Sequence, residues 1–319
     1  MSSTPITLAC IGGSFAQDLF AAKRLEGERM GARVTPFGKS QTIYRCRCEA
    51  GEYYLLLRHS DGRTPIASSF VNYRANIYAL KDLGVTHVIS WSNVRAVSHN
   101  YGIGQFAVVK DLIDETRHRV GTFFEHGALV ELRQWPVFCP TLRPVLCEAL
   151  GELGVKCTDG GTYLCTEGPR RETPAEVHRY ANWGADLLGH SLVPETFLAK
   201  ELQMCFAGLC LVSAYAETGS DHRPFEGGLL FGEMGLKNDR QRTQDAIAAI
   251  PGLIEKILLR ADRLDPQCLC QSGMAELIQN GQLSSDFRSW FPVLSPGGTM
   301  VPGISGVKPR TTIRGDAWA

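Results

Sequence analysis

The chain has 319 residues, 44% of them hydrophobic, and its 33 basic and 33 acidic residues give a formal net charge of zero. No basic stripe follows the chain, so we expect no nucleic-acid partner. No apolar run reaches the length of a membrane span, and Met1–Pro5 do not open a signal-peptide pattern, so we expect a cytoplasmic protein with no membrane contact.

The first half of the chain alternates strands with helices. We predict strands at residues 6–11, 53–57, 87–90 and 105–109 and a helix at 71–83, where apolar residues recur on one face. Polar groups follow three of these strands. Gly13 and Ser14 come after the first strand, Arg58 and His59 after the second, and Ser92 and Asn93 after the third. In open α/β sheets the carboxyl ends of strands are where ligands bind.

A strand at residues 161–166 is ended by Glu167-Gly168-Pro169, since Pro donates no ladder hydrogen bond. Thr173 then fits a helix N-cap, Pro174 the first helical position, and Glu176 the capping-box position. The sequence therefore predicts a strand, a loop and a helix that meet at one point.

The alternation continues to about residue 265. We predict helices at 141–153, 194–202 and 241–264 and strands at 185–188 and 205–212. This order indicates an α/β fold, with a mixed, largely parallel twisted sheet flanked by helices on both faces. We expect one core domain at 1–265 and a carboxyl-terminal extension at 266–319, with a short helix at 272–280 and then a Pro- and Gly-rich tail.

Eleven cysteines are scattered along the chain, and this odd count does not indicate a disulfide framework. Cys46 and Cys48, like Cys268 and Cys270, are one residue closer than the usual Cys-x-x-Cys spacing, and neither pair has a nearby histidine. We therefore expect buried apolar cysteines and no bound metal.

Several ordered motifs between residues 6 and 215 carry a resemblance to the methylthioadenosine phosphorylase branch of the trimeric purine nucleoside phosphorylase family. They include Ile11-Gly12-Gly13-Ser14, Thr35-Pro36-Phe37-Gly38-Lys39, Arg58-His59, residues 71–81, Asp111-Leu112-Ile113-Asp114-Glu115-Thr116, Glu167-Gly168-Pro169-Arg170 and Val193-Pro194-Glu195. The resemblance implies a nucleoside phosphorylase-like fold and a homotrimer.

The resemblance also implies a reaction. Inorganic phosphate, as co-substrate, attacks C1 of the ribose of a purine nucleoside, giving the free base and a (methylthio)ribose 1-phosphate in purine salvage, and no cofactor is needed. Six positions carry over as phosphate-binding residues: Ser14, Arg58, His59, Ser92, Asn93 and Ser191.

The nucleoside pocket departs from the family pattern. Ala214 stands where the family has Asp or Asn beside the base, and Ala216 stands where the adenine branch has a second Asp. His190 replaces a Met beneath the ribose, while Arg171 replaces an aromatic residue and Arg95 replaces a small one. The added positive residues predict a pocket that favours anionic ligands.

Alanine cannot donate a proton to the leaving base, and losing a positioned acid typically costs about 10²–10⁴ in rate. Glu217 is the nearest carboxylate that could replace it, and His190 is a second titratable group. We therefore expect Glu217 and His190 to be catalytic and Arg171, His190, Ser213 and Ala214 to contact the nucleoside.

We therefore predict a purine nucleoside phosphorylase of the methylthioadenosine type. Two alternatives remain open, namely a relative that acts on another, anionic N-glycoside and a non-catalytic relative that binds a nucleotide.

Overall fold

The computed structural model describes residues 6–60, 64–126, 128–217, 237–264, 268–291, 293–294 and 300–301. The chain divides into two compact units. The first is Met1–Phe123 with Leu132–Gly273, and the second is Phe124–Glu131 with Met274–Ala319. Among the described residues, no helix is long and apolar enough to cross a membrane.

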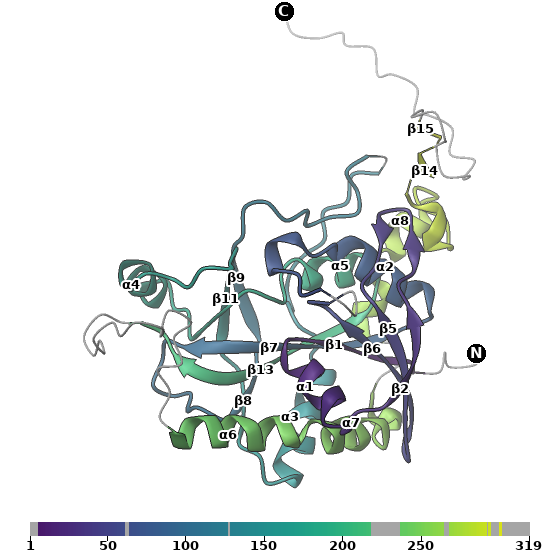
Figure 1. Ribbon diagram of the computed structural model, residues 1–319. Helices are drawn as coiled ribbons and strands as arrows, with labels where there is room; N and C mark the ends of the chain where they lie inside the picture. The colour runs from purple at the N-terminus through teal and green to yellow at the C-terminus, as the bar shows by residue number, and fades with distance from the viewer. Residues whose placement is uncertain are drawn as a thin grey trace, which may run out of the picture. The chain divides into compact units, whose positions relative to one another are not determined.

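The centre of the first unit is an 11-stranded mixed sheet (Figure 1). Its main path has the strand order β10-β8-β13-β7-β1-β6-β5-β2, and β12, β11 and β9 continue from β7. The strands are β1 Leu8–Gly12, β2 Gly27–Gly31, β5 Ile43–Cys48, β6 Gly51–Leu57, β7 His87–Ala96, β8 Phe106–Val108, β9 Asp111–Glu115, β10 Cys157–Asp159, β11 Thr162–Thr166, β12 Leu187–Gly189 and β13 Cys205–Tyr215. The predicted mixed sheet is confirmed, because β1 pairs in parallel with β6 and β7 whereas β5 pairs antiparallel with β6.

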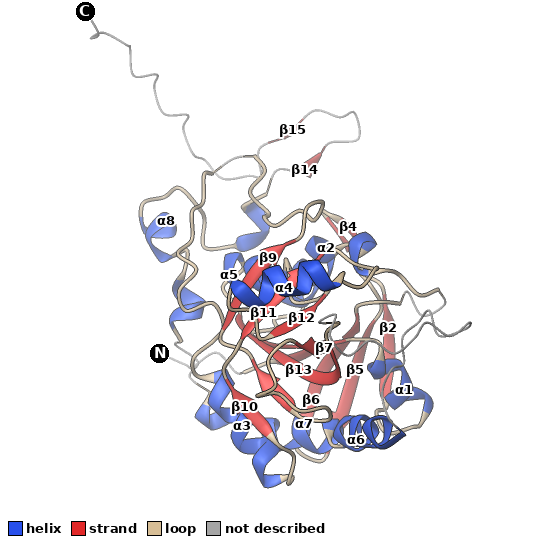
Figure 2. Ribbon diagram, turned by 90° about the vertical axis from the view of Figure 1, so that its left-hand side faces the viewer, coloured by secondary structure: helices blue, strands red, loops and turns tan. Residues whose placement is uncertain are grey.

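Helices cover both faces of this sheet, with α3, α6 and α7 on one side and α2 and α5 on the other (Figures 1 and 2). The helices of this unit are α1 Phe15–Ala21, α2 Tyr73–Asp82, α3 Leu142–Glu152, α4 Pro174–Asn182, α5 Glu195–Glu201, α6 Lys237–Ala248 and α7 Ile250–Leu258. Three 3₁₀ turns accompany them, η1 Ser68–Phe70, η2 Ala261–Arg263 and η3 Leu269–Ser272. The strands β3 Val34–Thr35 and β4 Gly38–Lys39 form a separate short hairpin. Apolar side chains such as Leu146, Leu209 and Ile254 fill the space between α3, α7 and the sheet. Burial of these side chains is the main force that holds the layers together.

β7 is longer than the four residues that the sequence predicts. It runs through Ala96, because Ser92 and Asn93 continue the ladder opposite Cys210 and Leu211 of β13. The polar residues expected in a loop therefore lie within a strand, and the end of β7 also pairs with β12 through Arg95 and Ala96.

Two helix predictions differ in outcome. The capping box at the start of α4 is confirmed, because the Thr173 side chain accepts from the Glu176 backbone N–H and the Glu176 carboxylate accepts from that of Thr173. The single helix predicted at 241–264 is wrong. It divides into α6 and α7 at Ala249, because Pro251 donates no helical hydrogen bond and instead occupies the first turn of α7.

The second unit contains α8 Ala275–Gln279, the 3₁₀ turn η4 Phe287–Ser289 and the paired strands β14 Val293–Leu294 and β15 Met300–Val301. α8 lies within the helix predicted at 272–280. Inside this unit, the ring of Phe124 lies 5.3 Å from that of Phe291, centroid to centroid. Most of the predicted Pro- and Gly-rich tail, 295–299 and 302–319, lies outside the described residues.

Candidate active site

Two predicted phosphate-binding residues meet at the carboxyl ends of β1 and β7. Because these strands are parallel neighbours, the turn after β1 lies beside the polar part of β7. The amide of Asn93 donates to the hydroxyl of Ser14 at 3.4 Å, and both residues are exposed. They present a hydroxyl and an amide to solvent at the same edge of the sheet.

Ser92 and Ser191 are brought together by Tyr163, a residue that the sequence did not single out. The buried Tyr163 hydroxyl donates to the backbone carbonyl of Ser191 and accepts from its N–H, both at 2.9 Å. The neighbouring Ser92 side chain acts to lower the pKa of Tyr163 and donates to the Asn93 carbonyl at 3.4 Å. Burial raises the pKa of Tyr163 well above its usual value, so this hydroxyl stays protonated. Gly189 makes the arrangement possible, because a Cβ there would collide with the Tyr163 ring.

Arg58 is fully buried beneath the turn that follows β1. Its Nε and Nη2 donate to the carboxylate of Glu195 at 2.6 and 2.9 Å, its Nη1 donates to the Trp91 carbonyl at 3.0 Å, and its Nη2 also donates to Ser90. A Cβ on Gly13 would lie 3.9 Å from Nη1, so the glycine turn lies directly against the guanidinium. Arg58 thus fixes the floor under Gly13 through an ion pair that the sequence did not predict.

His59 follows Arg58 and is held as a neutral side chain. Its Nδ1 lies 3.1 Å from the Ile66 carbonyl, and because a carbonyl only accepts, Nδ1 carries the hydrogen. Burial, together with the charge of Arg58, lowers the pKa of His59 to about 4. At neutral pH its Nε2 is therefore a hydrogen-bond acceptor.

On the nucleoside side, His190, Arg95 and Glu172 form a cluster. Arg95 Nη2 donates to Glu172 Oε2 at 2.7 Å, and His190 Nε2 lies 3.3 Å from Glu172 Oε1 and 3.2 Å from Arg95 Nη2. The Thr166 hydroxyl donates to the same carboxylate at 2.7 Å. Although burial acts to raise the pKa of Glu172, the hydrogen bonds and the charge of Arg95 outweigh it and lower that pKa to about 2.

Glu172 changes the charge expected of the pocket. From the sequence, Arg95 adds a positive charge, but in the structure a buried carboxylate balances it. The sequence placed Glu172 next to Arg171 yet gave no sign that it would face Arg95, which is 77 residues away. The surplus of positive charge is therefore smaller than predicted.

Arg171 and Glu217 lie on the same side as this cluster. Arg171 is exposed, and its pKa is lowered by burial of part of the side chain and by the charge of Arg95, while Glu217 and Glu172 act in the opposite direction. Arg171 therefore interacts electrostatically with Glu217, the carboxylate predicted to replace the missing acid.

Ser213 and Ala214, the two remaining candidates for nucleoside binding, lie at the end of β13, and Ala216 follows directly after the strand. Ser213 donates to the Val94 carbonyl at 3.2 Å, and after a bulge Ala214 pairs with Arg95 in the β7 ladder. Ala216, by contrast, packs in a small apolar cluster with Val177 and Leu188, among others. An acid at position 214 would lie beside the Arg95 cluster, whereas one at 216 would be buried among apolar side chains.

Arg119 is a further residue that sequence reasoning missed. Its guanidinium donates to Glu167 Oε1 at 3.1 Å and to the carbonyls of His190, Val193 and Glu167 at 3.0, 2.6 and 2.8 Å. These bonds tie the loop after β11 to the loop after β12. Arg119 thereby fixes the position of the backbone that carries His190.

A pocket of about 290 Å³ lies next to the nucleoside side of the candidate site, and Ser14 is not among the residues that line it. Its lining includes Thr166, Gly168 and Glu172, which connect it to the His190 cluster. Gly168 has a φ of +63°, and a Cβ there would come within 2.9 Å of His190 Nδ1. The close approach of the Gly168 backbone therefore holds the histidine ring against the cluster.

Comparison with known proteins agrees with this arrangement. Residues 7–251 match the family described as the phosphorylase superfamily. A probable S-methyl-5′-thioinosine phosphorylase of Methanothermobacter thermautotrophicus is 39% identical over 209 residues, 66% of this chain and 71% of the relative. A probable 6-oxopurine nucleoside phosphorylase of Dictyoglomus turgidum is 32% identical over 86% of this chain and 99% of its own length.

A solved methylthioadenosine phosphorylase from an antarctic soil metagenomic library has the same fold. It superposes with a TM-score of 0.74 at 27% identity and covers 86% of this chain and 92% of its own. The family match spans the 11-stranded sheet, helices α1 to α6 and every residue of the site described above. The chain therefore belongs to the phosphorylase superfamily.

Proposed function

We propose that this protein is a purine nucleoside phosphorylase of the methylthioadenosine phosphorylase type. It cleaves the N-glycosidic bond of a purine nucleoside with inorganic phosphate and releases the free base and a (methylthio)ribose 1-phosphate. The relatives' names support this class of reaction. The proposal rests on one observation in the site: hydroxyl and amide groups at the ends of β1, β7 and β12 lie on the same sheet edge as the His190 cluster.

The phosphate side consists of Ser14, Asn93, Ser92 and Ser191, with Arg58 beneath the turn. Hydroxyls and backbone amides bind phosphate oxygens by donating hydrogen bonds, and Arg58, whose charge is balanced by Glu195, fixes the turn that carries Ser14. The neutral His59 accepts a hydrogen bond from a protonated phosphate oxygen. A phosphate bound here is oriented to attack the sugar carbon.

The nucleoside side consists of Arg171, Ser213, the backbone of Ala214 and the His190 cluster. When a phosphate oxygen bonds to C1, the bond from C1 to the base nitrogen breaks and its electron pair moves onto the purine. His190, held by Glu172, donates a hydrogen bond or proton to the departing base and so stabilises the developing negative charge. Glu217 is the second candidate for this role, through its position beside Arg171.

We extend the proposal to assembly and location. The family resemblance supports a homotrimer that uses nucleoside and phosphate as its small-molecule partners and requires no cofactor for the reaction. The eleven free cysteines support a reducing compartment such as the cytoplasm.

Purified protein incubated with methylthioadenosine, methylthioinosine, adenosine, inosine and guanosine, with and without phosphate, tests the proposal. Free base that appears only with phosphate supports phosphorolysis. Base that appears equally without phosphate indicates hydrolysis. Binding of a nucleoside without release of base indicates the non-catalytic alternative.

A further inference from the structure

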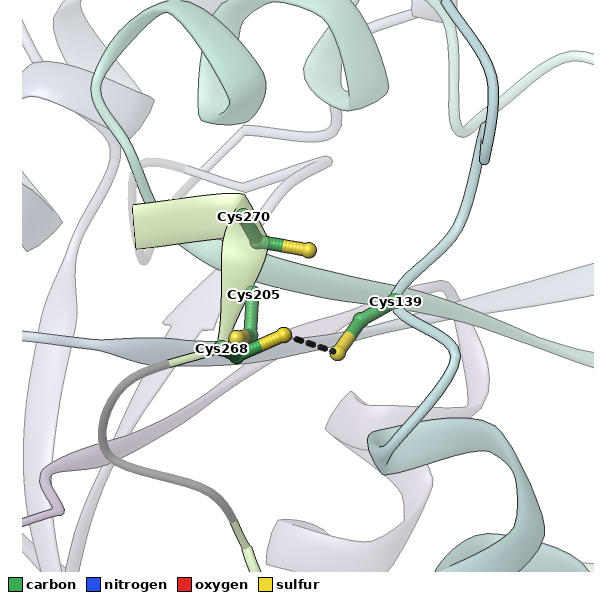
Figure 3. A group of neighbouring side chains, drawn as sticks. All are labelled: Cys139, Cys205, Cys268 and Cys270. Carbon is green, nitrogen blue, oxygen red and sulfur yellow. Dashed lines mark hydrogen bonds between the residues drawn. The ribbon is translucent and has the colours of Figure 1, made fainter. Parts of the chain in front are cut away.

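Four cysteines that are scattered in the sequence lie together in the first unit, at the end of β13 opposite to the candidate active site. Cys139 precedes α3, Cys205 begins β13, and Cys268 and Cys270 belong to the segment around η3 (Figure 3). All four sulfur atoms lie within 4.8 Å of one another, and all four are free thiols. The Cys139, Cys205 and Cys268 side chains are buried, and Cys270 is partly buried.

The spacing of these sulfurs fits a single tetrahedral metal ion. A zinc–sulfur bond of about 2.3 Å in tetrahedral geometry separates two ligand sulfurs by about 3.8 Å. Sγ of Cys139 and Sγ of Cys268 are 3.7 Å apart and point toward each other (Figure 3). This separation is far longer than a disulfide bond of about 2.0 Å. Four convergent thiolates select a thiophilic ion of tetrahedral preference.

The surroundings of the cluster also suit a metal–thiolate centre. The backbone N–H of Cys139 donates to the Phe206 carbonyl at 2.8 Å, which fixes this cysteine beside Cys205. Polar donors contact the sulfurs, with Gln271 Nε2 3.8 Å from Cys205 Sγ and Thr141 Oγ1 3.7 Å from Cys268 Sγ. Such outer contacts orient and stabilise thiolate ligands.

Positive charge is placed to balance the centre. Four thiolates around one Zn²⁺ leave two net negative charges. Lys81 interacts electrostatically with Cys205, and Lys200 with Cys270. The positive charges of the two lysines therefore act to offset the negative charge of the thiolates, although burial lowers the pKa of both lysines.

We propose that Cys139, Cys205, Cys268 and Cys270 bind one structural Zn²⁺ ion. The ion joins the segment before α3 and the segment after α7 to the first residue of β13. Ala214, at the other end of β13, is roughly 30 Å away at about 3.3 Å per residue, so the ion takes no part in the reaction. This site differs from our expectation of no bound metal, because spacing along the sequence shows only one Cys-x-Cys pair of the four ligands. It is independent of the proposed function.

Metal content tests the proposal directly. The full chain is expressed in zinc-supplemented medium, purified anaerobically with a reductant and without a chelator, and its metals are quantified by mass spectrometry. We expect about one zinc ion per chain, released when a mercurial reagent titrates the thiols. Cys268→Ser and Cys205→Ser should each lower the zinc content at least about fivefold, whereas Cys48→Ser, at a free cysteine outside the cluster, should not change it.

A second measurement covers the case in which a serine variant fails to fold. Wild-type protein is prepared with Co²⁺ instead of Zn²⁺, and its absorption spectrum is recorded. Intense sulfur-to-cobalt charge-transfer bands and the ligand-field bands of tetrahedral Co²⁺ support the four-thiolate site. Zinc well below about 0.2 ions per chain in the wild type, together with four alkylatable thiols or two mapped disulfides at these positions, would overturn it.

Discussion

Arg58 and Glu195 form a fully buried ion pair in which two guanidinium nitrogens donate to the two carboxylate oxygens, at 2.6 and 2.9 Å. The pair connects the end of β6 to the first residue of α5. Because the Ser90 hydroxyl also donates to Glu195, at 2.7 Å, the carboxylate is enclosed by hydrogen bonds. The turn at Gly13 lies against the Arg58 guanidinium, so the position of the phosphate-binding residues on this turn depends on the buried ion pair.

Removal of one charge from this pair should strongly destabilise the protein. Glu195→Gln leaves the Arg58 guanidinium buried without its counter-charge, and such a loss typically costs about 3–5 kcal/mol. Urea unfolding followed by circular dichroism measures the change. Glu52→Gln is the control, since it breaks an exposed pair with Arg47 and should leave the unfolding midpoint unchanged. Equal midpoints for the two variants would contradict this role of Arg58.

Glu172 should make stability depend on acid pH. Its pKa of about 2 in the folded protein lies below the unfolded value, so the stabilisation is complete above about pH 5 and is lost as pH falls toward 2. A lowering of the pKa of this size corresponds to roughly 3 kcal/mol of stability. Glu172→Gln should therefore be less stable than the wild type at pH 7, and the difference should shrink between pH 5 and pH 3. A difference that stays constant with pH would contradict the assignment.

His59 should remain neutral throughout the physiological range. Burial and Arg58 lower its pKa to about 4, and Nδ1 donates to the Ile66 carbonyl. Nitrogen-15 NMR of labelled protein, with the His59 signals assigned from a His59→Gln variant, should show one neutral tautomer with hydrogen on Nδ1 from pH 8 down to about pH 5. Protonation of His59 between pH 6 and 7 would show that the ring is not held as the structure has it.

Ala214→Asp should raise turnover of 6-aminopurine nucleosides. The carboxyl group would stand at the end of β13 beside Arg95. In its protonated form it can supply a proton to the leaving base, and in its ionised form it can accept a hydrogen bond from the 6-amino group. A positioned acid contributes about 10²–10⁴ in rate, so we expect kcat to rise at least about tenfold. Ala216→Asp is the matched control, because position 216 is 7% exposed in an apolar cluster, and it should lower stability without raising kcat. An equal response of kcat in the two variants would contradict the placement of the base beside position 214.

Local patterns in the sequence predicted much of the fold. Thr173, Pro174 and Glu176 are within four residues of one another, so their capping chemistry can be recognised from the sequence, and it is confirmed. The extension of β7 through Ser92 and Asn93 could not be predicted in this way, because it depends on pairing with β13, which lies more than 100 residues later. The pattern of apolar and polar residues around Ser92 and Asn93 does not distinguish a strand from a loop.

The site was predictable as a set of positions but not as a set of contacts. Ser14, Ser92 and Ser191 follow from the strand ends, whereas Tyr163, which is hydrogen-bonded to the backbone of Ser191, looks like any apolar residue of a buried strand. Glu172 and Arg119 gave no signal either, because their partners are supplied by distant segments. Contacts between distant segments decide which charges of the nucleoside pocket are balanced. The sequence overestimated the positive charge of this pocket, because it did not show that Glu172 pairs with Arg95.

The measurement that tests the central claim most directly is the release of free purine base, quantified by chromatography, from methylthioadenosine and methylthioinosine in the presence and absence of inorganic phosphate. The site described here predicts that base appears only with phosphate and that an equal amount of methylthioribose 1-phosphate accompanies it. Base released at the same rate without phosphate, or no base from any purine nucleoside with either the wild type or Ala214→Asp, would contradict the assignment as a phosphorylase.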